Sequence, residues 1–300
     1  MTTQPRRIGV AINPTASFGS TRAVGPMVLD ALEQAGHRAV RLQEQTVGQL
    51  RSAVQTAIEA GLDALVVVGG DGMVSLAVEA VRDSGLPFGV VPSGTGNDIA
   101  RGLGIPLGDP AAAIASLLRA LEGEPRVIDA GTVTDGERMT WFVGAVSAGF
   151  DALVNERANR MRRPRGRSRY TIAILRELLA LRPRRYELTV DGAPETVDAV
   201  LLAVANNTSI GGGMLIAPQA DLADGRFDLF VVAPVSRFRF LRLFPKVFSG
   251  AHTDLDIVRL SRVRSVSIAA DGITAYADGE RIGSLPVTID VVPGALRVLA

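Results

Sequence analysis

Three short loops carry the residues best suited to hold a phosphate group. Each loop contains glycine with a hydroxyl, amide or carboxyl side chain, and each follows an apolar run that predicts a buried strand. The loops are Asn13-Pro14-Thr15-Ala16-Ser17, Gly69-Gly70-Asp71-Gly72 and Ser93-Gly94-Thr95-Gly96-Asn97-Asp98. Glycine leaves backbone N–H groups open to a phosphate oxygen. A tight turn explains any one of these loops, but three in succession favour a nucleotide site.

The composition limits how such a site could work. Asp71 cannot itself bind phosphate, because two anions repel, so a carboxylate there indicates a bridging Mg²⁺ or water. The chain's one lysine, Lys246, does not follow a P-loop glycine pattern, which excludes Walker-type binding. Cysteine is absent and the only histidines are His37 and His252, which excludes thiol catalysis, Cys-ligated zinc and a His-rich metal site.

The elements that must position the loops alternate along the first part of the chain. Strands are expected at 8–12, 39–42, 64–68 and 88–91, and helices from Ser20 or Thr21 to 35 and at 47–60, 73–81 and 111–121. Apolar strands alternating with helices predict an α/β, Rossmann-like nucleotide-binding domain with a parallel sheet, at residues 5–130. The carboxyl ends of its strands are where such a sheet binds ligands.

The pattern changes after about residue 127. Apolar runs separated by D-G, G-G and P-G turn signals predict a second, β-rich (β-sandwich-like) domain at residues 131–290. Its expected strands are 141–146, 186–190, 197–203, 227–232, 263–268 and 287–292, with one helix near 170–181. The uncharged run 199–220 is long enough to span a membrane, but its glycines and asparagines predict a strand, a turn and another strand.

The ordered motifs resemble the catalytic domain of the diacylglycerol kinase family, which includes sphingosine and ceramide kinases and bacterial lipid kinases. The central matches are VVGGDGM at 67–73 and PSGTGNDIAR at 92–101. The resemblance extends to Asn13-Pro14, 147–151, 211–214, PQADLADGRFD at 218–228, Asp278-Gly279-Glu280 and 293–298. GGDG alone is shared with NAD kinases, so the ordered set carries the specificity.

The resemblance implies ATP-dependent phosphorylation of a lipid hydroxyl, with diacylglycerol as acceptor and phosphatidic acid as product. It implies ATP contacts from Asn13, Pro14, Thr15, Ala16, Ser17, Thr46, Gly69, Gly70, Asp71, Gly72, Met73, Gly94, Thr95, Gly96 and Asn97. Glu280 matches the general base, and Asp71, Asp98 and Asp278 match a Mg²⁺-linked network. A structural Mg²⁺ would be held by the Asp224 carboxylate and by backbone carbonyls of Asp221 and Arg226. The final segment, 291–300, is expected to return to the first domain.

Three features leave alternatives open. Asp278-Gly279 is also a strong hairpin signal, and Asp271-Gly272 serves as a control that we interpret as a plain turn. Met73 replaces the family's usual threonine, so only its backbone N–H could serve a phosphate. The acceptor could be a sphingoid base, ceramide or a polyprenol, and the chain could be a non-catalytic, nucleotide-responsive membrane-binding module.

The net charge of +1 conceals an uneven distribution. Eleven arginines and one acid between Arg157 and Arg185 give that segment a charge of +10. A solvated face, a nucleic-acid patch and an anionic membrane contact are the three interpretations. A lipid kinase must visit a bilayer, where each basic residue contributes about 1 kcal/mol. The absence of cysteine favours the cytoplasm. We therefore expect a cytoplasmic protein that associates transiently with the inner face of the membrane. We expect no nucleic-acid partner and leave a homodimer open.

Overall fold

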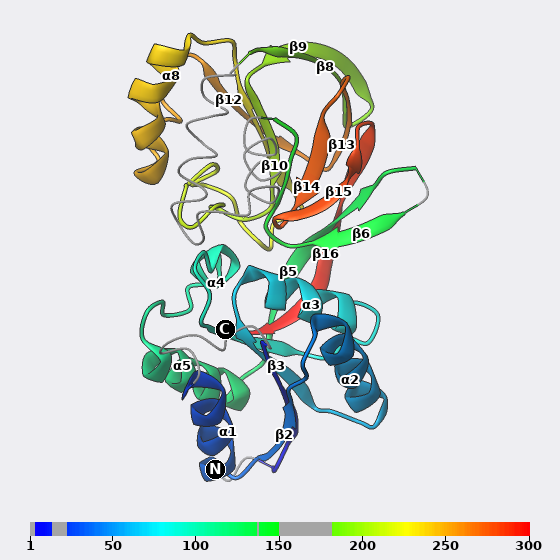
Figure 1. Cartoon of the computed structure of the whole chain (residues 1–300), viewed down its shortest axis with the longest axis vertical. Coiled ribbons are helices and arrows are strands. Elements are labelled where there is room, and N and C mark those ends of the chain that lie inside the picture. The colour runs from blue at the N-terminus through cyan, green and yellow to red at the C-terminus, as the bar shows by residue number, and fades with distance from the viewer. Residues whose placement is uncertain (1–3, 14–22, 137, 150–181) are drawn as a thin grey trace. The chain divides into compact units, whose positions relative to one another are not determined.

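The computed structural model describes residues 4–13, 23–136, 138–149 and 182–300 (Figure 1). The chain divides into two compact units. The α/β unit comprises Met1–Ile128 and Gly294–Ala300, and the β-rich unit comprises Asp129–Pro293.

The α/β unit is built on a parallel sheet of strand order β2-β1-β3-β4-β16. The strands are β1 (Arg7–Ile12), β2 (Arg38–Leu42), β3 (Ala64–Gly69), β4 (Phe88–Pro92) and the end of β16 (Val287–Leu299). The helices are α1 (Val24–Gln34), α2 (Val47–Glu59), α3 (Asp71–Val81), α4 (Asp98–Gly102) and α5 (Pro110–Glu122). Figure 1 shows α1 and α5 on one side of the sheet and α2 and α3 on the other.

The helices explain why the strands are apolar throughout. Every residue of β3 and β4 is buried, because helices cover both faces of the sheet. The expected strands at 8–12, 39–42, 64–68 and 88–91 all lie within observed strands, which confirms the α/β fold class. Val298 and Leu299 of β16 pair in parallel with Phe88 and Gly89 of β4.

The β-rich unit contains two largely antiparallel sheets. One has the order β12-β11-β10-β7-β14-β15, and the other joins β16, β13, β8 and β9, with β5 and β6 pairing beside β16. The strands are β5 (Arg126–Thr134), β6 (Met139–Phe142), β7 (Ala145–Ser147), β8 (Arg184–Val190), β9 (Ala193–Ala199), β10 (Leu201–Ala205), β11 (Phe227–Val232), β12 (Val258–Val263), β13 (Ser265–Ala269), β14 (Thr274–Ala277) and β15 (Glu280–Ser284). Its described helices are α8 (Arg237–Leu243) and the 3₁₀ helix η2 (Phe244–Phe248).

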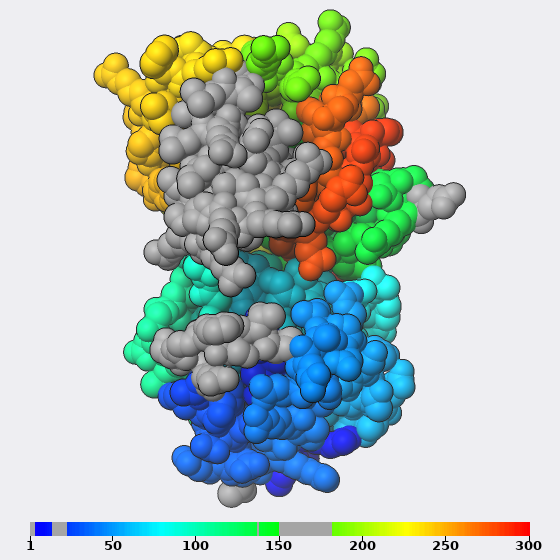
Figure 2. Space-filling model, viewed as in Figure 1, coloured from blue at the N-terminus to red at the C-terminus, as the bar shows by residue number. Residues whose placement is uncertain are grey.

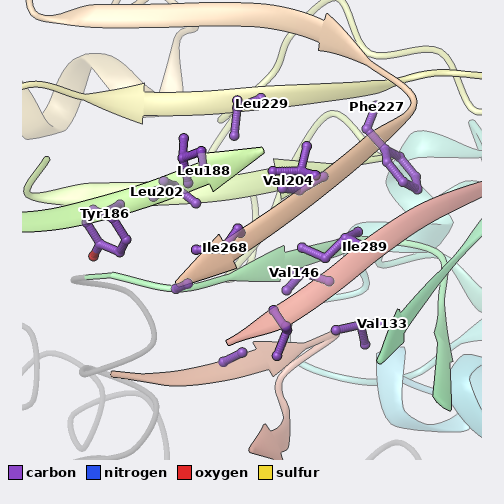
Figure 3. Close-up of a cluster of buried hydrophobic side chains, with 14 of the residues drawn as sticks. Val133, Val146, Tyr186, Leu188, Leu202, Val204, Phe227, Leu229, Ile268 and Ile289 are labelled. Carbon is purple, nitrogen blue, oxygen red and sulfur yellow. The ribbon is translucent and has the colours of Figure 1, made fainter. Parts of the chain in front are cut away.

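Side chains from both sheets form the main core of this unit (Figure 3). Tyr186 and Leu188 alternate with exposed residues along β8, as a half-buried strand requires. β10 is buried on both faces. Its Leu202 and Val204 enter the main core, whereas Leu201, Ala203 and Ala205 belong to a second apolar cluster on the other face of the six-stranded sheet. This is the expected sandwich-like arrangement.

Four details of the expected β pattern are wrong. The run 141–146 divides at Gly144 into β6 and β7, 197–203 divides at Val200 into β9 and β10, and 263–268 divides at Arg264 into β12 and β13, with the two halves in different sheets each time. No glycine or proline marks the changes of sheet at Val200 and Arg264. After β10, the glycines at 211–213 adopt φ of 63°, 87° and 110°, and an isolated Ile210–Met214 bridge stands where a strand was expected.

The helix expected near 170–181 lies outside the described residues, as does most of the arginine-rich segment. Within the described part of the chain, no helix combines the length and apolar character needed to cross a membrane.

Candidate functional site

The carboxyl edge of the parallel sheet collects the predicted loops of the α/β unit. β1 and β3 are neighbours, and their connections leave toward β2 and β4 on opposite sides, which is the switch point where open α/β sheets bind ligands. Asn13 follows β1, and its N–H donates to the Val68 carbonyl at 3.2 Å. Ser93 follows β4, and its N–H donates to the Gly69 carbonyl at 2.9 Å. Backbone hydrogen bonds therefore hold the beginnings of the three loops side by side.

The loops at 69–72 and 93–98 approach each other closely at Gly70 and Gly94. A Cβ placed on Gly94 would lie 2.4 Å from the Gly70 Cα, closer than any real side chain allows. Asn97 stabilises the loop at 93–98, because its Oδ1 accepts from the Gly94 N–H at 3.0 Å and its Nδ2 donates to the Gly94 carbonyl at 2.9 Å. Asn97 adopts a left-handed φ of 53°, which asparagine tolerates well. Close backbone approach therefore requires the glycines here.

Two aspartates lie beside these glycines. Asp71 is the first residue of α3, and its Oδ1 accepts from the Ile99 N–H at 3.1 Å. Burial raises the pKa of the Asp71 carboxyl; the Ile99 hydrogen bond opposes the rise, and the nearby Asp98 carboxylate adds to it. Asp98 is 7% exposed and pairs with Arg101 at 2.6 Å between Oδ1 and Nη1. The site thus holds a partly desolvated carboxylate next to a second acid.

Arg101 is a site residue that the sequence analysis gave no role. Its guanidinium binds Asp98 and also donates to the Gly96 carbonyl at 3.3 Å, so it ties α4 to the glycine loop. The Asp98–Arg101 spacing of three residues, which brings side chains together on a helix, was the available signal.

Two of the predicted ATP contacts have local structural roles. The Met73 side chain is buried beneath Gly69, and its N–H donates to the Gly70 carbonyl at 2.8 Å. The backbone group expected to serve a phosphate is therefore engaged in the first turn of α3. Thr46 forms a capping box with Gln49 at the start of α2. Gly72 lies in the loop that follows β3 and Thr95 in the loop that follows β4. Four other predicted contacts, Pro14, Thr15, Ala16 and Ser17, lie outside the described residues.

The Asp278-Gly279 pair of the β-rich unit forms the turn between β14 and β15. Asp278 and Gly279 have positive φ of 49° and 82°, as a tight hairpin requires. The Asp278 carboxylate accepts three backbone hydrogen bonds, at 2.9 Å from Val143, 2.8 Å from Gly144 and 3.0 Å from Ala145. Glu280 opens β15 and is exposed. Asp271-Gly272 forms a turn between β13 and β14.

The predicted structural-metal loop is stabilised by its own aspartates. Asp221 Oδ1 accepts from the Ala223 N–H at 3.0 Å, and Asp224 Oδ1 accepts from the Arg226 N–H at 2.9 Å. The other Asp224 oxygen pairs with Arg262. Asp129, 2% exposed and not identified from the sequence, accepts from the Gly225 N–H at 2.6 Å. A Mg²⁺ at Asp224 would compete with Arg262 for this carboxylate oxygen.

Among the described residues, no three His, Cys, Asp or Glu side chains are grouped so that they could share a metal. This leaves room for Mg²⁺, which keeps several waters and uses only one or two protein carboxylates when phosphates complete its shell. Asp71 suits that mode, because a cation would offset the burial and the repulsion from Asp98 that raise its pKa.

Comparison with known proteins agrees with this geometry. Residues 7–133 match the model of the diacylglycerol kinase catalytic domain, and 144–300 match that of the YegS C-terminal NAD kinase beta sandwich-like domain. The chain belongs to this family of lipid kinases. Kinase membership implies ATP as the phosphoryl donor.

Individual relatives cover nearly the whole chain. A Mycobacterium tuberculosis protein named diacylglycerol kinase is 40% identical over 98% of this chain and 94% of its own. A Pseudomonas aeruginosa protein named probable lipid kinase YegS-like is 30% identical over 84% of this chain and 81% of its own. A putative diacylglycerol kinase from Bacillus anthracis has the same fold, with a TM-score of 0.78 at 21% identity, covering 99% of this chain and 98% of that one.

Proposed function

We propose that this lipid kinase transfers the γ-phosphoryl group of ATP to diacylglycerol, giving phosphatidic acid and ADP. The observation that carries the proposal is the cluster at the β1–β3 switch point, where Gly70, Gly94 and Asp71 meet at the carboxyl edge of the sheet. Diacylglycerol is the acceptor named for the M. tuberculosis relative. A sphingoid base, ceramide or polyprenol is the alternative class of acceptor.

The chemistry assigns a task to each acidic residue. The acceptor hydroxyl forms an O–P bond to the γ-phosphorus, the bond from that phosphorus to the ADP oxygen breaks, and Glu280 accepts the hydroxyl proton. Asp71 and Asp98 would hold Mg²⁺, with Asp278 as a further member of the network that the resemblance implies. When bound, Mg²⁺ offsets the charge of the transferring phosphoryl group. The glycine loops supply uncrowded backbone around the phosphates.

An acceptor panel tests the substrate. Purified protein is supplied with radiolabelled ATP, Mg²⁺ and one lipid alcohol dispersed in detergent micelles. We expect labelled phosphatidic acid from diacylglycerol, at a higher kcat/KM than for ceramide, sphingosine or a polyprenol. Faster phosphorylation of another alcohol would reassign the acceptor within lipid kinases. Equal ATP hydrolysis with and without every lipid would contradict the transferase assignment and favour a nucleotide-responsive membrane module.

The structural Mg²⁺ at Asp221, Asp224 and Arg226 stays a separate prediction. Ligand binding to the folded state raises the melting temperature by mass action. We expect added Mg²⁺ to raise the melting temperature of the parent more than that of Asp224→Asn, because Mg²⁺ held at Asp71 and Asp98 would stabilise both proteins. An equal rise in both would contradict the metal role and leave Asp224 as the partner of Arg262.

A further inference from the structure

The segment Ser236–Ser249, which we call the α8–η2 segment, covers the outer face of the six-stranded sheet. Phe240 and Val247 are 7% and 8% exposed and belong to the apolar cluster that contains Phe230 of β11. The Phe244 ring lies 5.8 Å from the Phe240 ring and 6.1 Å from the Phe248 ring, measured between centroids. The Ser236 side chain caps α8 by accepting from the Arg239 N–H. The segment is therefore firmly anchored on one side.

Its other side presents large apolar side chains to solvent. Phe238 is 88% exposed, Leu241 51% and Phe248 54%. Phe238 and Leu241 are i,i+3 neighbours on α8, and Phe238 is nearly opposite the buried Phe240 around the helix. Figure 2 shows this segment, in yellow, at the surface of the β-rich unit. Three large side chains exposed within eleven residues are unusual for a surface with no apolar partner.

The same segment is strongly basic. It contains Arg237, Arg239, Arg242 and Lys246 and no acidic residue. Arg239 pairs with Asp256 at 2.8 Å. Within the described part of the chain, Arg242 and Lys246 form no ion pair. Arg242 lies four residues after Phe238, so cationic and aromatic side chains project from one face of α8.

We propose that the α8–η2 segment docks this protein on an anionic lipid surface. Phe238, Leu241 and Phe248 enter the interfacial region, while Arg242 and Lys246 contact the phosphate headgroups. A surface helix with aromatic and leucine side chains on one face, flanked by Arg and Lys, has the chemistry of an interfacial anchor. Projecting side chains suit a deformable lipid surface, whereas a protein partner would need a matching groove.

The α8–η2 segment is separate in sequence from the arginine-rich segment 157–185, for which the sequence predicts membrane contact. The docking proposal rests on the proposed function in one respect, namely that the acceptor is a membrane lipid. The docking test contains neither ATP nor diacylglycerol, so the two proposals can fail separately.

The first test measures binding of the full chain to vesicles by flotation. The vesicles are phosphatidylcholine alone or equal parts phosphatidylcholine and phosphatidylglycerol. We expect the parent to bind the mixed vesicles, less at high salt. Replacing Phe238 and Leu241 together by alanine should lower the partition coefficient about tenfold, and Arg242→Gln about fivefold. Met27→Ala on α1 and Arg119→Gln on α5, which remove exposed side chains of the same kinds, should leave it unchanged.

The second test reports insertion rather than total affinity. The chain has one tryptophan, Trp141, which supplies a constant background. Phe238→Trp should show a blue-shifted emission and quenching by brominated lipid when mixed vesicles are added, and Met27→Trp should show neither. Vesicle binding by the Phe238→Trp protein with no change in its emission would overturn the proposal.

Two further outcomes decide the remaining alternatives. If the double alanine variant floats as well as the parent, the α8–η2 segment is not the anchor. If light scattering without vesicles shows a dimer that Phe238→Ala dissociates, the segment is an interface between copies of this chain, and the proposal is wrong. A parent that floats but phosphorylates no lipid would instead contradict only the proposed function.

Discussion

Two aspartate–glycine pairs, one in each unit, use the same dipeptide in opposite ways. In the α/β unit, the Asp71 carboxylate accepts backbone hydrogen bonds, the one from Ile99 foremost, yet burial and the nearby Asp98 still raise its pKa. In the β-rich unit, the Asp278 carboxylate accepts three backbone hydrogen bonds from residues 143–145. The donors of Asp71 do not offset the cost of its burial, whereas the three donors of Asp278 satisfy both of its carboxylate oxygens.

The difference separates a carboxylate suited to binding a cation from one that stabilises the fold. A buried carboxylate whose donors do not offset its burial, with an acid beside it, is destabilised in its charged form, and a cation relieves that cost. A carboxylate with three donors instead fixes the loop that supplies them. On these contacts, removal of Asp71 should affect the reaction more than folding, whereas removal of Asp278 should affect folding in addition to any role in the predicted Mg²⁺ network.

The largest expected effect is that of Asp71→Asn on turnover. Loss of the charge that would hold Mg²⁺ should lower kcat by about a hundredfold to a thousandfold. The unfolding free energy should stay the same or rise at neutral pH, because a carboxyl whose folded pKa is raised contributes stability when protonated and loses it as pH rises through that pKa. Kinase assays and urea unfolding of the same preparation measure both. A large loss of stability with unchanged kcat would reverse the comparison.

Glu280→Gln should have the next largest effect, and it falls in the hairpin that Asp278 holds. Removing a general base lowers kcat by about a hundredfold, with little change in the KM for ATP. Glu280 is exposed, so unfolding should change little. Arg281→Gln, at the neighbouring exposed position of β15, is the matched control and should retain activity. Full activity of Glu280→Gln would remove Glu280 from the proposed chemistry.

The sequence predicts more of the α/β unit than of the β-rich one. Strands such as Ala64–Gly69 are apolar throughout and end in glycine loops, so their position in a parallel sheet follows directly. The divisions at Val200 and Arg264 could not be predicted, because a strand that changes sheets keeps its apolar pattern. Motif order predicts Asp71 and Asp98 as site residues, but nothing local distinguishes the donors of Asp71 from those of Asp278. That distinction depends on Ile99 and on residues 143–145, which tertiary structure brings near.

Asp278→Asn should destabilise the protein. In Asp278→Asn, the amide oxygen can still accept two backbone N–H groups, but the amide nitrogen faces the third donor, from Val143. Leaving a part-buried donor unsatisfied should lower the unfolding free energy by about 2 kcal/mol. Asp271→Asn, in the exposed Asp271-Gly272 turn, should change it by far less. If urea unfolding shows the same loss of unfolding free energy for both variants, the three hydrogen bonds of Asp278 contribute no more to stability than an exposed turn aspartate does.

The smallest effect should come from Asp191, which resembles Asp278 in an exposed setting. Asp191 also has a positive φ, of 48°, and its Oδ1 accepts from the Arg264 and Ser265 N–H groups at 2.8 and 2.9 Å. These hydrogen bonds lower its pKa, so the stability they give is present above the ordinary carboxyl pKa and is lost as pH falls through the lower, folded value. Asp191→Asn should therefore destabilise by only about 0.5 kcal/mol at neutral pH, because solvent screens the charge and the amide oxygen still accepts. The difference in unfolding free energy between the two proteins should begin to narrow below about pH 4 and close once the pH is below the folded pKa of Asp191. A gap in urea unfolding that is independent of pH would show that the turn depends on the geometry of residue 191 and not on its charge.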